Sequence, residues 1–362
     1  MVPNRSIAFA LGGLSGNNAH GAGFLQAALE MDIEPIMISF SSGQILWVSR
    51  YLEEKLQKPH KPDLREILIK DIERIAPTES SDLNTALLLL SGISGVYRPA
   101  FEEFTEDFFK NSANFFKSVF DQWPKAFLTK EVLELVPGRL LVPDLPESFY
   151  EKVSKAFNDE REIGLVFNSF NPIEGIEKVY LNEAAKNREA TCRSKYRWRS
   201  EYCEITPEGV KDALKLYQYG FDCDCGHLDG AYYRQILLSE LAMATDIFVA
   251  RPINYRWIGG SLPTSIAGIE DLKMKVGFNG SYAGERDMIN MISKLVEDGV
   301  LARPYKKINL IEIEIEIKRG YFDYIYESLD VFDSAHTRAG EEFRKFTDTE
   351  TGTPGGVVPL GA

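Results

Sequence analysis

A serine junction at residues 38–47, ISFSSGQILW, joins an apolar, strand-like run to a helix-like run. A small-x-Ser-x-Gly segment in this position is typical of a nucleophile elbow, a strained turn that presents a serine hydroxyl outward. In this register Ser41 is the candidate nucleophile, Ser39 replaces the usual first glycine, and Gly43 lets the helix pack close to the strand. The N–H groups at the start of the helix favour an oxyanion nearby. The alternative is a plain strand-to-helix turn.

A glycine-rich loop, GGLSGNNAHGAG at residues 12–23, precedes this junction and follows another strand-like run. An ester oxygen becomes negative when its carbonyl is attacked, and each preorganised N–H donor contributes about 3 to 4 kcal/mol of stabilisation. The loop could supply such donors. A nucleotide-phosphate loop is the alternative, but Ala22 and Gly23 stand where that motif needs Lys and Ser or Thr, and no G-x-G-x-x-G occurs.

A catalytic serine needs a base. The chain has four histidines, and the usual Ser, Asp, His order permits Ser41, Asp229 and His336. His336 lies in an amphipathic segment that we expect Gly340 to end or interrupt, which favours a surface histidine. Asp229 begins the turn DGA, which precedes a helix and a buried strand.

In the order GGLSGNNAHGAG, SFSSG and DGA, the sequence resembles the patatin-like phospholipases over most of residues 5–345. The resemblance implies a three-layer α/β/α fold with a mostly parallel central sheet and a helical insertion. It also implies that Ser41 is the nucleophile and Asp229 its direct base, a dyad without histidine, metal or cofactor. The oxyanion hole would be formed by the N–H groups of Gly12, Gly13 and Leu14. The chain lacks the family's third consecutive glycine and the Arg or Lys that follows.

From this resemblance we expect a serine acyl hydrolase that cleaves phospholipids or other lipid acyl esters through an acyl-enzyme. Burial should raise the pKa of Asp229 above its unperturbed value of about 3.9, because a carboxylate with that pKa is a weak base at neutral pH. Two alternatives stay open: a catalytically degenerate module that binds lipid or protein, and an esterase with a Ser-Asp-His triad.

The resemblance also sets the domain boundaries. We expect one acyl hydrolase domain at residues 1–345, with a helical insertion or cap at about 50–135, and a flexible tail at 346–362 rich in Gly, Pro and Thr. Phenylalanines at helical spacing in the insertion indicate either core packing or an apolar surface for acyl chains. The strict Ile/Glu alternation of INLIEIEIEIK, residues 308–318, predicts a strand with one buried and one wet face.

Two further clusters have alternative interpretations. CDCGHLD places Cys223, Cys225, His227 and Asp229 at every second position, a set that zinc could use. Structural zinc sites favour cysteine pairs with C-x2–4-C spacing, and they take their ligands from separated segments. The preferred interpretation is therefore that the cysteines are small buried residues before the turn that begins with Asp229. RSKYRWRS, residues 193–200, could meet a lipid phosphate, although a solvated edge is the simpler account.

Composition narrows the class of partner. The net charge of −13 argues against nucleic acid or an anionic membrane as a bulk partner. No apolar run approaches the roughly 20 residues that span a bilayer, and no signal peptide is evident. Four cysteines in 362 residues favour reduced thiols, so we expect a cytoplasmic protein whose membrane contact is peripheral and apolar.

Overall fold

The computed structural model describes most of the chain, and every structural statement below refers to the residues that it describes. They are residues 5–14, 18–56, 63–75, 97–99, 101–122, 141–143, 145–189, 200–216, 226–257, 261–264, 266–315 and 328–351.

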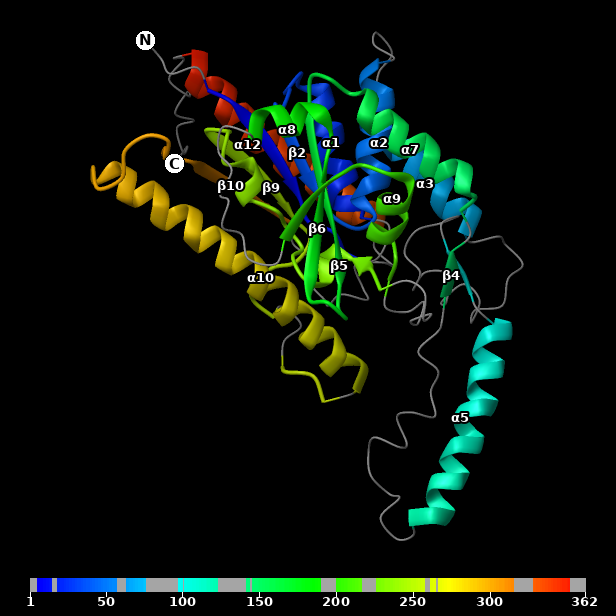
Figure 1. Ribbon diagram of the computed structural model, residues 1–362. Coiled ribbons are helices and arrows are strands. Elements are labelled where there is room, and N and C mark those ends of the chain that lie inside the picture. Colours follow the sequence, from blue (N-terminus) through cyan, green and yellow to red (C-terminus); the bar gives the residue numbers. More distant parts are fainter. Residues whose placement is uncertain are drawn as a thin grey trace, which may run out of the picture.

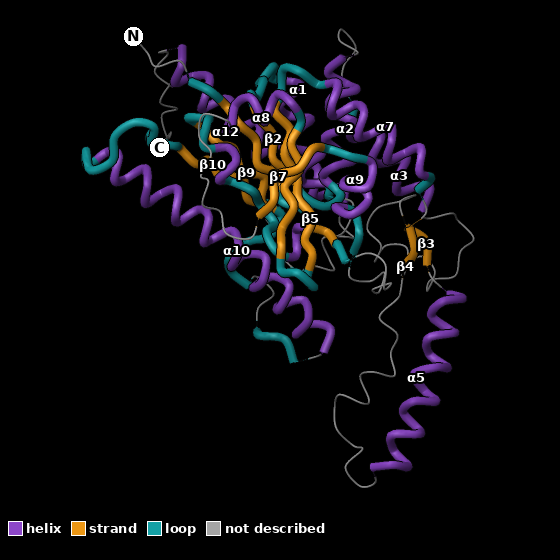
Figure 2. The backbone as a smooth tube through the Cα atoms, in the orientation of Figure 1, coloured by secondary structure: helices purple, strands orange, loops and turns teal. Residues whose placement is uncertain are grey.

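A mostly parallel sheet runs through the molecule in the order β10-β9-β1-β2-β5-β6-β7 (Figures 1 and 2). Within this sheet the antiparallel pairs among the described residues all involve β5, which pairs with β6 and with the short β8. The prediction of an α/β fold with a mostly parallel sheet is confirmed. The strands are β1 (Ile7–Leu11), β2 (Met37–Phe40), β5 (Gly164–Asn171), β6 (Ile176–Leu181), β7 (Ser200–Glu204), β8 (Leu228–Asp229), β9 (Asp246–Arg251) and β10 (Asn309–Glu314).

Helices cover both faces of the sheet, and β1 shows why. Its residues alternate between two hydrophobic clusters, with Phe9 and Leu11 in one and Ala8 and Ala10 in the other. A central parallel strand must be apolar on both sides, because both sides are buried. The first cluster includes side chains of α1 (Ala19–Glu30), α2 (Gln44–Leu56), α3 (Leu64–Ile75), α7 (Glu147–Asp159), α9 (Pro207–Ala213) and α12 (Ser328–Thr351). The second includes side chains of α8 (Glu183–Glu189) and α10 (Ile266–Glu297).

The glycine-rich segment is shorter as a loop than expected. Helix α1 begins at Ala19, so Gly21 and Gly23 are helical residues. A Cβ at Gly23 would lie 2.2 Å from the Phe332 carbonyl oxygen of α12, and one at Gly21 would lie 1.9 Å from the Gln44 side chain. These glycines therefore allow close helix packing. Gly16 lies outside the described residues.

The predicted insertion also begins later than residue 50. In α2 Tyr51 and Leu52 are core residues, and in α3 Leu64 and Leu68 are fully buried in the same cluster. The described residues of this part, 51–56 and 63–75, therefore pack with the main body.

The rest of the insertion is described in part. It contains the antiparallel pair β3 (Tyr97–Pro99) and β4 (Leu141–Pro143). Helix α5 (Phe101–Gln122) stands apart from the layered body (Figure 1). Its Phe108, Phe109 and Phe116 are exposed, so core packing does not account for them. No helix within the described ranges is long and apolar enough to cross a bilayer.

The C-terminal helix differs from the prediction in two ways. Helix α12 continues through Gly340, which neither ends nor interrupts it, and runs to Thr351. Residues 346–351 are thus helical, and the remainder of the predicted tail lies outside the described residues. Packing of Phe343 and Phe346 against the core explains the extension, because tertiary contacts outweigh the small helix penalty of one glycine.

The acidic side of β10 is not simply solvated. Glu312 and Glu314 form ion pairs with Arg251 of β9, whose side chain is almost fully buried. Tyr255 and Tyr282 pack on the same guanidinium. The glutamates that alternate with isoleucine in β10 therefore bind a buried arginine side chain on one face of the strand.

Candidate active site

The serine junction forms a strained turn at the end of β2. The strand ends at Phe40, α2 begins at Gln44, and Ser42 between them has a φ of 57°. A left-handed backbone conformation costs roughly 1 to 2 kcal/mol for a residue other than glycine. Such strain is typical of an elbow that presents a side chain, and here it falls on Ser42 and not on the predicted Ser41.

Asp229, the predicted base, is a buried residue. It ends β8, which pairs with β5 at Ser169, and caps a 3-10 turn by accepting the Ala231 N–H at 2.8 Å. Burial raises the pKa of Asp229 to about 7, opposed by the Ser42 hydroxyl and the Ala231 N–H, both of which lower it. The carboxylate is thus placed to exchange a proton near neutral pH.

Ser42 is the serine that interacts with this carboxylate. It is 1% exposed, and its Oγ influences the Asp229 pKa. Its Oγ nevertheless has no hydrogen-bond partner among the described residues. A nucleophile and base often stand in such a loose contact before substrate binds.

Ser41 is held elsewhere by two backbone groups. Its Oγ donates to the Gln235 carbonyl oxygen at 2.6 Å and accepts the Gly13 N–H at 2.9 Å. Ser39 lies on the same side of β2 and donates to the Leu237 carbonyl oxygen at 2.6 Å. The two serines therefore fasten the elbow to the segment that follows the DGA turn. Ser42, and not Ser41, is the serine whose hydroxyl acts on the pKa of Asp229, and the catalytic role predicted for Ser41 stays a prediction.

The predicted oxyanion donors are all in place but all occupied. The Gly12 N–H donates to Ala250 O at 3.2 Å, the Gly13 N–H to Ser41 Oγ, and the Leu14 N–H to Asn18 Oδ1 at 2.8 Å. A Cβ at Gly13 would lie 2.5 Å from Ser42 Cβ, so only glycine fits beside the elbow. Because Gly13 bonds to a side chain that can rotate, its N–H is the one that a small movement can release.

The backbone N–H of Gly43 is a second group that could donate a hydrogen bond to an oxyanion. This glycine follows Ser42 directly and precedes the first residue of α2. None of the described residues accepts a hydrogen bond from its N–H. In elbow enzymes the residue after the nucleophile supplies one oxyanion donor.

A buried polar pair supports the loop from behind. His20 Nε2 lies 2.7 Å from the Gly12 carbonyl oxygen, and Gln44 Nε2 lies 3.3 Å from the same oxygen. Burial lowers the pKa of His20 to about 3, so the ring is neutral at physiological pH. His20 therefore positions the loop as a neutral hydrogen-bonding group, a role that the sequence did not suggest.

The other candidate residues do not join this site. His336 Nε2 lies 2.9 Å from a carboxylate oxygen of Glu30. Glu30 is at the C-terminal end of α1, and at 1.5 Å per residue this end lies about 15 Å from the N-terminal end of the helix, which is the end near the elbow. His227 Nδ1 lies 3.5 Å from Asp212, away from the Asp229 carboxylate. The described residues contain no group of three or more potential metal ligands. Cys223, Cys225, His60 and residues 193–199 lie outside them.

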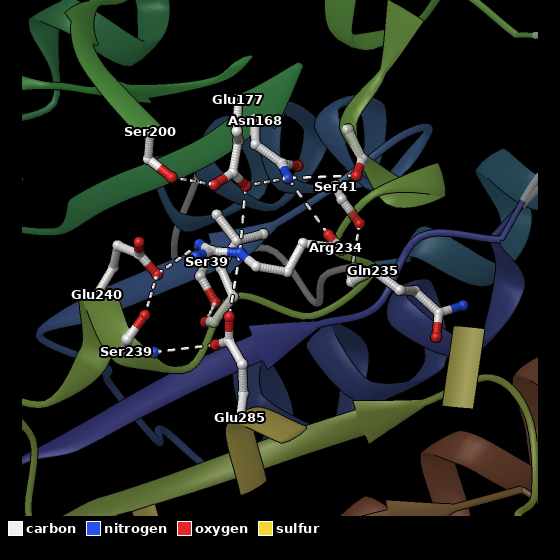
Figure 3. A network of polar contacts seen from close by, with 12 residues as sticks. Ser39, Ser41, Asn168, Glu177, Ser200, Arg234, Gln235, Ser239, Glu240 and Glu285 are labelled. Atoms are coloured by element: carbon white, nitrogen blue, oxygen red, sulfur yellow. Dashed lines mark hydrogen bonds and ion pairs between the residues drawn. The ribbon is translucent and has the colours of Figure 1, made fainter. Parts of the chain in front are cut away.

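A buried charge network that the sequence did not suggest is centred on Arg234 (Figure 3). The Arg234 guanidinium contacts Glu240 at 2.7 Å and Glu177 and Glu285 at 3.2 Å each. Asn168 donates to Glu177 and to the carbonyl oxygens of Gly230 and Arg234. The one available signal was a charged or polar residue inside an otherwise apolar run, as in GLVFNSF and YYRQILL.

No known family model matches the sequence, and no curated protein matches it.

Proposed function

We propose that this chain is a serine acyl hydrolase of the patatin-like type, with Ser42 as the nucleophile and Asp229 as its direct base. The observation that carries the proposal is the strained, left-handed backbone of Ser42, whose hydroxyl lowers the pKa of the buried Asp229 carboxylate against the effect of burial, which raises it to about 7. The order of glycine loop, elbow and DGA turn supports the same activity.

In the proposed reaction Ser42 Oγ attacks the ester carbonyl carbon while its proton passes to Asp229. The tetrahedral oxyanion is stabilised by the Gly43 N–H and, after Ser41 rotates away, by the Gly13 N–H. Collapse breaks the bond to the alcohol, which takes the proton from Asp229. Water then gives a proton to Asp229 and attacks the acyl-enzyme, and the carboxylic acid leaves as Ser42 regains its hydrogen.

The proposed substrate class is a lipid acyl ester, met at a surface in the cytoplasm. The exposed Phe108, Phe109 and Phe116 of α5 could contact acyl chains. With a net charge of −13, any membrane contact would be apolar and peripheral. Because Ser42 is buried, an ester reaches it only after neighbouring side chains move.

A fluorophosphonate probe tests this assignment directly, because it labels an activated serine. We expect the wild-type chain to be labelled, Ser42→Ala to be unlabelled, and the adduct to map to Ser42 by peptide mass spectrometry. An adduct on Ser41 would overturn the choice of nucleophile.

One observation favours a second function. Since the three predicted oxyanion donors all bond within the protein, a catalytically degenerate module that binds lipid or protein is the alternative. Absence of labelling in the folded wild-type chain, together with binding to phosphatidylcholine vesicles, would select the lipid-binding form of it.

A further inference from the structure

Helix α10 exposes a row of large apolar side chains. It is a long helix on the outside of the sheet (Figure 1). Tyr282 and Ile289 point inward and are buried. On the other side, Val276 is 63% and Met291 58% exposed, and Ile269 and Met288 are each 40% exposed. Large apolar side chains exposed together along one helix of a folded protein indicate an interaction site.

Three of these residues, Ile269, Val276 and Met291, belong to a seven-residue row with a symmetric register about Gly280, while Met288 lies beside this row. The other members lie four, seven and eleven residues before Gly280 and four, seven and eleven residues after it. At 100° per residue they all fall within about 40° of the Gly280 direction. The members are Ile269, Lys273, Val276, Gly280, Gly284, Asp287 and Met291.

We propose that this face binds the same face of a second copy of the chain, with the two helices antiparallel about a two-fold axis at Gly280. In that arrangement a residue before Gly280 meets the residue at the same distance after it in the second copy. Ile269 meets Met291, which pairs apolar with apolar. Lys273 meets Asp287, which pairs opposite charges.

The volumes are complementary as well. Val276 meets Gly284, and a Cβ placed at Gly280 or Gly284 would have no atom within 4 Å. The two backbones can therefore approach closely at the axis while each Val276 fills the space beside a glycine. The four-and-three spacing of the row is that of a helix-pair seam.

Charge selects a second copy over another occupant. Both exposed charges of the row, Lys273 and Asp287, find an opposite charge in the symmetric pairing and lie between apolar contacts. Asp287 also contacts Arg286 of its own chain at 2.7 Å. A neutral lipid surface offers no charges that match this alternation of charged and apolar residues.

Sedimentation equilibrium of the full-length chain tests the pairing. We expect a concentration-dependent dimer in the wild type. Lys273→Glu alone, or Asp287→Lys alone, places like charges opposite each other and should raise the dimer Kd at least about tenfold. Lys345→Glu on α12 is the matched control, because it makes the same charge change on an exposed residue away from the row, and should leave Kd unchanged.

Mixing provides the sharpest arm. The two single variants should form a mixed dimer when combined, because each supplies the charge that the other lacks at both crossings. Gly280→Leu should abolish dimerisation while circular dichroism stays that of the wild type. A wild type that is monomeric at about 100 μM, or a dimer that neither charge reversal weakens, would overturn the proposal. Binding of the monomer to phosphatidylcholine vesicles that depends on Val276 would also overturn the proposal, and it would show that this face binds lipid.

Discussion

The Ser41 hydroxyl donates a 2.6 Å hydrogen bond to the Gln235 carbonyl oxygen, and thereby joins the elbow to the segment after the DGA turn. Ser41 Oγ itself accepts the Gly13 N–H. Both hydrogen-bonding functions of Ser41 are thus committed to backbone groups. The adjacent Ser42 carries the backbone strain and approaches Asp229. Two neighbouring serines have different tasks, positioning for one and, we propose, attack for the other.

The first prediction separates these tasks by activity. Ser42→Ala should lower kcat/KM for p-nitrophenyl butyrate on the order of 10³-fold or more, since removal of a nucleophile abolishes the acyl-enzyme path. Ser41→Ala should retain activity within about tenfold of the wild type, because it frees the Gly13 N–H while weakening the loop. Near-UV circular dichroism of both variants checks folding. Equal loss of activity in two folded variants would contradict the division of roles.

The second prediction concerns pH and activity. The proposed base acts only when ionised, and burial raises the pKa of Asp229 to about 7. We therefore expect kcat/KM to rise with pH through a midpoint near 7 and then to level off. Esterase rates between pH 5 and 9 in buffers of constant ionic strength measure this. A profile that is already flat at pH 5 would contradict the role of Asp229.

The third prediction concerns how the Asp229 carboxylate makes the free energy of unfolding depend on pH. Its folded pKa lies above its unfolded value of about 3.9, so the folded state binds the proton more tightly and unfolding becomes easier as pH rises from about 4 to 7. Asp229→Asn stays neutral and escapes this cost. At pH 8 the variant should be more stable to urea by roughly 1 to 4 kcal/mol, while at pH 4 the difference should nearly vanish.

The opposite sign at pH 8, with Asp229→Asn less stable, would show that the ionised carboxylate is well satisfied in the fold. Asp212→Asn offers a comparison at a second carboxylate whose pKa burial also raises, but which lies beside His227 and Lys residues.

Local patterns predicted the elements around the site because they are properties of short segments. The apolar runs around the site became β1, β2 and β9, and the junction at residues 38–47 became a strand, a strained turn and a helix. The turn that begins with Asp229 also formed as expected, with a capping carboxylate.

The details that failed depend on contacts distant in sequence. Nothing within SFSSG says which serine takes the left-handed φ, since that follows from where Gln235 and Leu237 accept hydrogen bonds. Gly23 read as a loop glycine, because the sequence cannot show that α12 passes over it. Arg234 was missed because its three carboxylate partners come from β6, from a turn and from α10.

The fourth prediction tests the glycine of the DGA turn. A Cβ at Gly230 would lie 2.2 Å from Asn168 Cγ, so Gly230→Ala must displace a buried amide and disturb Asp229 beside it. We expect a loss of about 1 to 3 kcal/mol in unfolding free energy and a loss of activity. Gly340→Ala in α12 is the control, because its Cβ would meet only Arg344 at 3.6 Å. It should be neutral or stabilising by up to about 1 kcal/mol.

The fifth prediction concerns the buried charge network. Arg234→Met removes the cation that Glu177, Glu240 and Glu285 share, and should cost about 3 to 5 kcal/mol of unfolding free energy at pH 8 because buried carboxylates lose their partner. Burial already raises the pKa of Glu177 and raises that of Glu285 to about 7.

Without Arg234 those pKa values rise further above their unfolded values, so the penalty should grow with pH and be smaller at pH 5, where the glutamates hold protons. Arg65→Met, which breaks an exposed pair with Asp333, is the control and should cost at most about 1 kcal/mol at either pH. Urea unfolding of both variants at the two pH values decides the matter. A penalty for Arg234→Met that is equal at pH 5 and pH 8 would mean that its loss acts through packing and not through charge.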